Sequence, residues 1–109
     1  MEVRYGDPDL RALCESDRDL RRKYGSECAK KIRTRLQALR VADSIDDLMQ
    51  MPGHCHPLKG DYYEDCYAFR LHGAMRLIFR PMTDEERAAE GIPDVQTALV
   101  VEIINYHCG

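Results

Sequence analysis

The stretch YAFRLHGAMRLIFR, residues 67–80, decides the fold that the sequence predicts. Apolar side chains occupy every second position on both sides of His72-Gly73-Ala74, which is the spacing of two β-strands joined by a turn. A turn centred on Gly73 sets Arg70 opposite Arg76, on the face away from the phenylalanines. Two opposed arginines repel each other, so this pair is favoured beside an anion. The alternative is that a neighbouring Asp or Glu neutralises the pair.

The N-terminal part of the chain predicts two helices joined by a short turn. Asp7 offers an N-cap oxygen, Pro8 suits the first helical position, and apolar residues follow at helical spacing up to a stop at Gly25. Ser26 can cap the second helix, in which apolar residues recur at steps of three and four through Leu39. The apolar stripe is predicted to form core, with Lys and Arg residues around it.

The remaining segments complete a predicted α+β domain. Ser44 begins a segment that resembles a capping box and predicts a short helix ending before Pro52-Gly53. Residues 81–93 are acidic and polar, so we expect an exposed loop. Residues 97–106 form the most apolar strand, expected inside the sheet, and Val3–Tyr5 fit a short first strand. Helices followed by a meander of strands favour one domain spanning the whole chain, with N-terminal helices on one face of a small antiparallel sheet.

Length and composition exclude several classes of protein. A chain of 109 residues suits one domain, and its longest apolar run, Ala98 to Val101, is too short to span a membrane. Acidic residues near the N-terminus do not fit a secretory signal, so we expect a cytoplasmic protein whose five cysteines are free thiols. The chain has no P-loop and no GxGxxG motif, and we expect no cofactor.

The net charge of −3 hides a basic stretch. Nine basic and two acidic residues lie between Arg18 and Arg40, a local balance of +7. A local basic patch can bind a polyanion on an acidic protein, because salt screens distant charges within roughly 8 Å. Lys30, Lys31 and Arg33 are therefore candidate RNA-binding residues. The alternative is that these side chains form only a solvated helix face.

Seven residues supply the chemistry that metal-free RNA cleavage requires. A base must accept a proton from the 2′-hydroxyl, cations must stabilise the phosphate, and an acid must protonate the departing 5′ oxygen. Each histidine alone is more often a hydrogen-bonding residue, so the set matters more than its members. The candidates are His54, His56, Lys59, Arg70, Arg76, Tyr106 and His107, and among them Arg70 and His56 are expected to bind RNA.

Metal binding and cysteine catalysis receive less support. His54-Cys55-His56, Cys66 and His107-Cys108 offer suitable ligand atoms for a transition metal. However, adjacent residues in an extended strand point in opposite directions, and neither CxxC nor HExxH spacing occurs. We therefore expect no metal site, and we expect the cysteines to behave as small buried hydrophobes.

Several segments together resemble the HigB-like branch of the RelE/ParE toxin superfamily. They are RLQAL (35–39), ADSIDDL (42–48), PGHCHPLKGD (52–61), RLIF (76–79) after a Gly turn, and VEIINYH (101–107). The resemblance covers nearly the whole chain, and the PG…HPLKG block combined with the terminal Tyr-His is its most specific part. It implies a RelE-like fold and the toxin of a type II toxin–antitoxin pair, typically a ribosome-dependent mRNA endonuclease.

The resemblance also implies partners and roles for individual residues. The expected substrate is mRNA on the ribosome, and the expected partner is a HigA-like helix-turn-helix antitoxin. Lys59 and Arg76 match basic positions near the scissile phosphate. Tyr106 and His107 match a terminal pair implicated in catalysis, with His107 as general acid or base, and His54 matches the neighbourhood of another family histidine.

An alternative is a non-catalytic protein with the same fold that binds an antitoxin or acts as a transcriptional co-regulator. Asn105 stands where the family has Asp, and Met75 stands where a tryptophan is common. The acidic net charge is unusual for a ribosome-binding toxin, since phosphate contacts dominate nucleic-acid affinity. A gyrase poison of the ParE kind is a third possibility, against which His107 speaks.

Overall fold

A computed structural model describes residues 1–60, 63–93 and 95–105 of the chain. Its elements follow in the order β1 (Glu2–Tyr5), α1 (Pro8–Cys14), α2 (Asp17–Tyr24), α3 (Ser26–Val41), α4 (Ile45–Gln50), β2 (His56–Pro57), β3 (Tyr67–Arg70), β4 (Met75–Pro81), α5 (Asp84–Ala89) and β5 (Thr97–Asn105). In these ranges no helix combines the length and the apolar character needed to cross a membrane.

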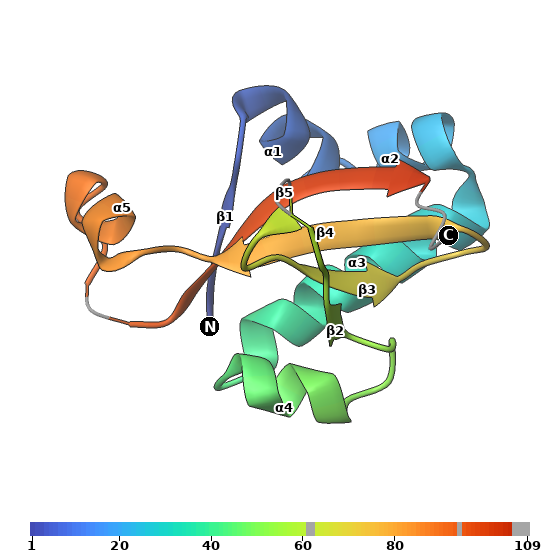
Figure 1. Ribbon diagram of the computed structural model, residues 1–109. Helices are drawn as coiled ribbons and strands as arrows, with labels where there is room; N and C mark the ends of the chain where they lie inside the picture. The colour runs from blue at the N-terminus through green and yellow to red at the C-terminus, as the bar shows by residue number, and fades with distance from the viewer. Residues whose placement is uncertain (61–62, 94, 106–109) are drawn as a thin grey trace.

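The strands form one mixed sheet in the order β1-β5-β4-β3-β2 (Figure 1). β2, β3, β4 and β5 pair antiparallel, as predicted, and β5 lies inside the sheet. The prediction of a wholly antiparallel sheet is wrong at β1, which pairs with β5 in parallel, with Val3 opposite Ala98. Strand direction could not be inferred there, because alternation places side chains on a face but carries no information about the direction of a distant partner.

The central hairpin has the predicted register. Arg70 pairs with Arg76 across β3 and β4. The turn is closed by the Leu71 amide, which donates to the Met75 carbonyl at 3.0 Å. The alternation of residues 67–80 therefore sets the two faces of the sheet as expected.

Three expectations about helices are wrong, each for a local reason. Residues 8–24 form two helices, because the Ser16 side chain accepts from the Asp19 amide and begins α2. α3 begins at Ser26 without a side-chain cap, and Gly25 occupies the N-cap position. The segment 81–93 contains α5, which starts at a capping box formed by Thr83 and Glu86. The cap predicted at Ser44 is confirmed by its hydrogen bond from the Asp47 amide at 3.2 Å.

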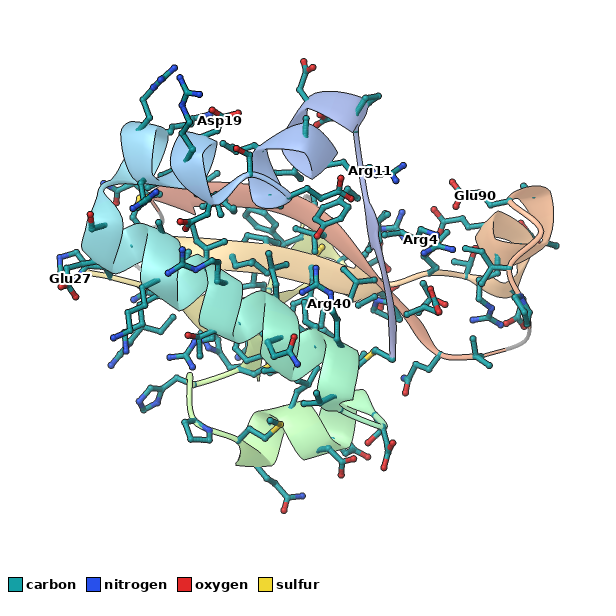
Figure 2. All side chains as sticks on the ribbon, turned by 180° about the vertical axis from the view of Figure 1, so that it is seen from behind. Arg4, Arg11, Asp19, Glu27, Arg40 and Glu90 are labelled. Atoms are coloured by element: carbon teal, nitrogen blue, oxygen red, sulfur yellow. The ribbon has the colours of Figure 1, made fainter. Side chains whose placement is uncertain are left out.

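The helices α1 to α4 cover one face of the sheet. The main core joins their buried residues, including Leu20, Ile32 and Leu36, to Phe69 and Phe79 of the sheet. Figure 2 shows α3 in front of the strands when the molecule is seen from behind, with Glu27 and Arg40 toward its two ends. The prediction that N-terminal helices pack on one sheet face is confirmed by this core.

The opposite sheet face carries a smaller apolar cluster. We call it the open face and define it by its strand residues His56, Ala68, Arg70, Arg76, Ile78, Glu102 and Ile104. Leu58 and Tyr63 pack against Ala68 and Ile78 from the segment that connects β2 to β3. The open face is thus partly covered by a piece of chain and not by a helix.

Arg35 joins α3 to the edge of the sheet. Its side chain is buried, and its Nε donates to the Arg70 carbonyl at 3.1 Å while Nη1 donates to the Pro52 carbonyl at 3.3 Å. The Arg70 amide in turn donates to the Gly53 carbonyl at 2.8 Å. A Cβ on Gly53 would lie 2.8 Å from the guanidinium carbon of Arg35, so a glycine is needed for this close approach.

Replacing Gly53 with alanine is expected to lower the free energy of unfolding by about 3 kcal/mol. The φ of +121° strains an L-residue, and the new methyl group would displace Arg35. Gly60→Ala is the matched control, because its φ is +105° and a Cβ there meets nothing within 4 Å. Urea unfolding should show a loss of about 1 kcal/mol for the control. Equal losses in the two variants would contradict the close approach of Arg35.

Candidate functional site

Strand register gathers charged residues on the open face. Arg76 lies opposite Arg70 on one side and Ile104 on the other, and Ile78 lies opposite Glu102. Diagonal neighbours on one sheet face are roughly 7 Å apart, within reach of long side chains. Arg76 and Glu102 are such diagonal neighbours, so cations and a carboxylate meet on one surface.

The two arginines remain available to an anion. Arg70 is exposed, and the half-buried Arg76 donates from Nη1 to the carbonyls of Gly73 and Met75, both at 2.8 Å. Within the described part of the chain, no Asp or Glu forms a salt bridge with either arginine. The alternative of a neutralising neighbour therefore finds no support in these residues. Two adjacent guanidinium groups favour a phosphate-like ligand.

A β-bulge turns Glu102 toward the open face. Ala98 and Val100 are buried against the helices, and strict alternation would send Glu102 to the same side. The register shifts between Ile78 and Phe79, whose partners are Glu102 and Val100, so Val101 is an extra residue. Bulges often re-aim a side chain in this way.

The sequence prediction missed Glu102 and Tyr63. The Tyr63 hydroxyl donates to Glu102 Oε1 at 3.0 Å, and both side chains are half-buried. A single charged residue within the apolar stretch of β5 was the one available signal for Glu102. Nothing in the local pattern indicated Tyr63, because its contact depends on how the segment between β2 and β3 crosses the sheet.

The two histidines of the PGHCHPLKG block differ in position. His56 belongs to β2, lies opposite Ala68 and is exposed on the open face, whereas His54 precedes the strand. The Nδ1 atom of His56 lies 2.8 Å from the His54 carbonyl oxygen. Since a carbonyl can only accept, this contact requires a proton on Nδ1 and leaves Nε2 free to accept one in the neutral ring. His54 has a φ of +52°, a conformation that is uncommon outside glycine.

The other predicted site residues fall into three groups. Lys59 is exposed in the segment that follows β2, next to Leu58, which packs against the smaller apolar cluster. Lys30, Lys31 and Arg33 are exposed on α3, which packs on the opposite sheet face, and Arg33 forms an ion pair with Asp17. The structure therefore does not bring these three together with Arg70 and Arg76. Tyr106 and His107 lie outside the described residues.

The cysteines do not form a reactive site among the described residues. Cys14, Cys28, Cys55 and Cys66 are free and buried, as expected. Burial raises the pKa of the Cys55 thiol to about 12 and that of Cys14 to about 11, so both thiols are protonated at neutral pH. No three His, Cys, Asp or Glu side chains in the described ranges are grouped so that they could hold a metal ion.

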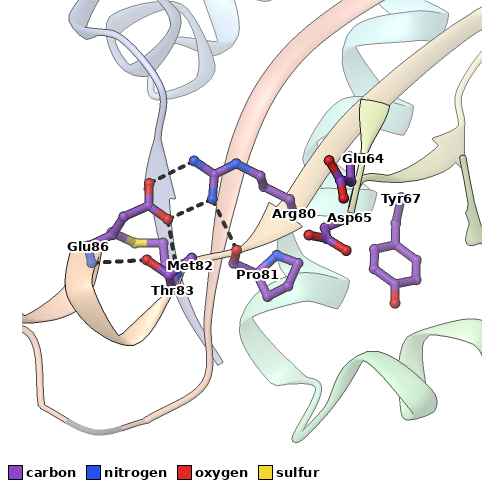
Figure 3. Close-up of a pocket in the computed structure, with 8 residues that line it drawn as sticks. All are labelled: Glu64, Asp65, Tyr67, Arg80, Pro81, Met82, Thr83 and Glu86. Atoms are coloured by element: carbon purple, nitrogen blue, oxygen red, sulfur yellow. Dashed lines mark hydrogen bonds and ion pairs between the residues drawn. The ribbon is translucent and has the colours of Figure 1, made fainter. Parts of the chain in front are cut away.

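A pocket of about 570 Å³ lies at the other end of β4 (Figure 3). Arg80 faces it and forms two 2.7 Å hydrogen bonds with the carboxylate of Glu86, while Glu64 and Asp65 line the same pocket. The Arg80 guanidinium and the Thr83 amide hold the pKa of Glu86 at about 2. Because Arg80 is already paired, this pocket is a poor anion site, and the ion pair fastens α5 to β4.

The Arg80–Glu86 pair is expected to stabilise the fold above about pH 4.5 and to lose that effect as the pH falls toward 2. The pKa of Glu86 is depressed in the folded state, so folding favours its charged form. Glu86→Gln should therefore lower the free energy of unfolding by ~1 kcal/mol at pH 7, since the pair is partly solvent-screened. Urea unfolding between pH 7 and pH 2.5 measures the difference. Glu85→Gln is the control, and a Glu86→Gln effect that does not change with pH would contradict the ion pair.

Comparison with known proteins finds the same fold in a solved toxin structure. A solved structure, the YoeB/ParE toxin from Agrobacterium tumefaciens, matches 98% of this chain and 100% of its own with a TM-score of 0.60 and 14% sequence identity. At that identity the likeness establishes the fold alone. No protein-family model matches the chain. No curated protein matches it either. The chain thus has the fold of a YoeB/ParE toxin, and its membership of the superfamily and of the HigB-like branch stays a prediction.

Proposed function

We propose that this protein is the toxin of a type II toxin–antitoxin system and that it cleaves mRNA, on the ribosome, without a metal ion. The observation that carries the proposal is the Arg70–Arg76 pair on the open face of a YoeB/ParE-like fold, where no carboxylate of residues 1–60, 63–93 or 95–105 forms a salt bridge with either arginine. A cytoplasmic HigA-like helix-turn-helix antitoxin is the proposed partner. The sequence resemblance to the HigB-like branch supports the proposal.

The proposed reaction uses the residues around this pair. A base removes the proton of the 2′-hydroxyl, whose oxygen attacks the phosphorus and forms a 2′,3′-cyclic phosphate. The bond to the 5′ oxygen breaks, and an acid protonates that oxygen. Arg76 and Lys59 stabilise the charge on the phosphate, and Arg70 holds the flanking backbone. His107 is the proposed acid or base, with Tyr106 stacking or hydrogen bonding, on the strength of the resemblance.

The hydrogen bond at His56 refines the roles of the two histidines. His54 was the expected catalytic residue and His56 an RNA contact. The position of His56 on the open face, with Nε2 free to accept a proton, supports an acid–base role for His56. His54 then acts through its carbonyl, which orients the ring of His56.

Expression of the wild-type protein in bacteria is expected to arrest growth, and co-expression of the neighbouring antitoxin gene should relieve the arrest. Arg76→Ala should restore growth, because removing one phosphate-stabilising cation lowers catalysis by roughly 100-fold or more. His107→Ala and His56→Ala should also restore growth, whereas His54→Ala should not.

Arg22→Ala is the matched control for this experiment. Arg22 is exposed on α2, on the helical side of the sheet, so the same change of side chain should leave toxicity intact. Immunoblots and circular dichroism establish that each variant is expressed and folded. Unimpaired growth of cells that contain abundant folded wild-type protein would contradict the proposal that the protein is a toxin.

The runner-up is a non-catalytic protein of the same fold that binds an antitoxin or regulates transcription. The net charge of −3 favours it, because a polyanion such as the ribosome repels an acidic protein at long range. Asn105 at the end of β5, in place of an acidic residue, also favours it. Tight binding to the helix-turn-helix partner with unaltered cellular mRNA would support this alternative.

A further inference from the structure

The segment between β2 and β3 is tied to the middle of the sheet. It leaves β2, crosses the open face and returns to β3 (Figure 1), and the Tyr63 hydroxyl reaches across to Glu102 of β5 at 3.0 Å. β5 is separated from β3 by β4, so Tyr63 of the connecting segment makes this bond to a strand that is not a neighbour of β2 or β3. A polar bond at that point fastens an otherwise irregular segment to the interior of the fold.

The fastening depends on the bulge in β5. Without the extra residue Val101, Glu102 would continue the alternation of Ala98 and Val100 and would face the apolar core. A carboxylate there would be buried without a partner, at high cost in free energy. The bulge instead delivers Glu102 to the open face, where Tyr63 meets it. Bulges of this kind are common beside active sites.

Lys59 lies between two anchored points of the same segment. The Leu58 amide donates to the Cys66 carbonyl at 2.9 Å, and the Tyr63 amide donates to the Gly60 carbonyl at 3.2 Å. Leu58 and Tyr63 also pack on Ala68 and Ile78. The main chain on both sides of Lys59 is therefore held, while its side chain stays exposed.

We propose that Tyr63 and Glu102 are positioning residues, whose hydrogen bond holds the segment that carries Lys59 against the open face on which the Arg70–Arg76 pair also lies. This inference rests on the proposed RNA cleavage and adds to it two residues that need not touch the substrate. The carboxylate acts as a hydrogen-bond acceptor and not as a base. A small displacement of a cation from the scissile phosphate is sufficient to lower the rate by about 10- to 100-fold.

The test measures cleavage of an mRNA in a reconstituted bacterial translation system, mapped by primer extension. Tyr63→Phe and Glu102→Ala should each lower kcat by about 10-fold or more, and together by no more than either alone. Glu102→Gln should retain most of the activity, because the amide oxygen still accepts from Tyr63. In a Lys59→Ala background, Tyr63→Phe should cause no further loss.

Two results would overturn the proposal. Equal loss in Glu102→Gln and Glu102→Ala would mean that the charge itself is required, as for a general base. If Tyr63→Phe lowers kcat as much in the Lys59→Ala background as in the wild type, the Tyr63–Glu102 hydrogen bond does not act through Lys59. Both outcomes leave RNA cleavage by the wild type intact, so they are distinct from failure of the proposed function.

Amide hydrogen exchange tests whether the Tyr63–Glu102 hydrogen bond holds the segment, independently of RNA cleavage. Tyr63→Phe should speed exchange at the Leu58 and Cys66 amides while the amides of α3 remain protected. Unchanged exchange would mean that the Tyr63–Glu102 hydrogen bond does not hold the segment, whatever the activity of the variant. If Tyr63→Phe speeds exchange but the wild type cleaves no RNA, the Tyr63–Glu102 hydrogen bond does hold the segment. That outcome would overturn the role of the bond in positioning Lys59, together with the proposed function.

Discussion

The buried guanidinium of Arg35 is the interaction on which the geometry of the sheet edge depends. A buried cation is costly unless its donors are satisfied, and burial lowers the pKa of Arg35. Its donors reach the carbonyls of Arg70 and Pro52, and its guanidinium carbon lies 6.0 Å from the centre of the Phe69 ring. The helix α3, the turn before β2 and the end of β3 are therefore held by one side chain.

This constraint reaches the proposed site through the main chain. The turn at Gly53 leads directly into β2, which carries His56, and Arg70 presents its own side chain to the open face while its carbonyl binds Arg35. The core side of the sheet thus determines where the residues of the other side lie. The basic residues of α3 lie on the helix-covered side of the sheet, where Arg33 is paired with Asp17. The sheet separates them from the open face.

The sequence was sufficient to predict the central hairpin, the pairing of Arg70 with Arg76 and the interior strand β5, because alternation and a glycine turn carry that information locally. It could not predict the parallel direction of β1, which depends on a partner far along the chain. It also missed the Ser16 cap, whose short polar side chain interrupts an otherwise helical pattern. The position of Glu102 on the open face could not be predicted for a different reason. A bulge moves a residue to the other face of the sheet and leaves no mark in the sequence of the strand.

The charge of the open face is what would let an acidic chain bind the proposed RNA substrate. Salt screens the net charge of −3 within roughly 8 Å, so the local pair of arginines dominates the field that a bound phosphate meets. The acidic residues of α5 are held at the other end of β4, where Glu86 is engaged by Arg80. The two charge groups thus lie at opposite ends of β4, and the Glu102 carboxylate on the open face accepts a hydrogen bond from Tyr63.

The most direct measurement of the central claim is the chemistry of RNA ends produced on purified bacterial ribosomes programmed with a defined mRNA. Cleavage by attack of the 2′ oxygen predicts 5′-hydroxyl ends within the translated frame, matched by 2′,3′-cyclic phosphate ends upstream, in a buffer where ribosomes remain intact. Fragments with 5′-phosphate ends, or intact mRNA in the presence of folded protein, would contradict the assignment of the open face as a metal-free RNA-cleaving site.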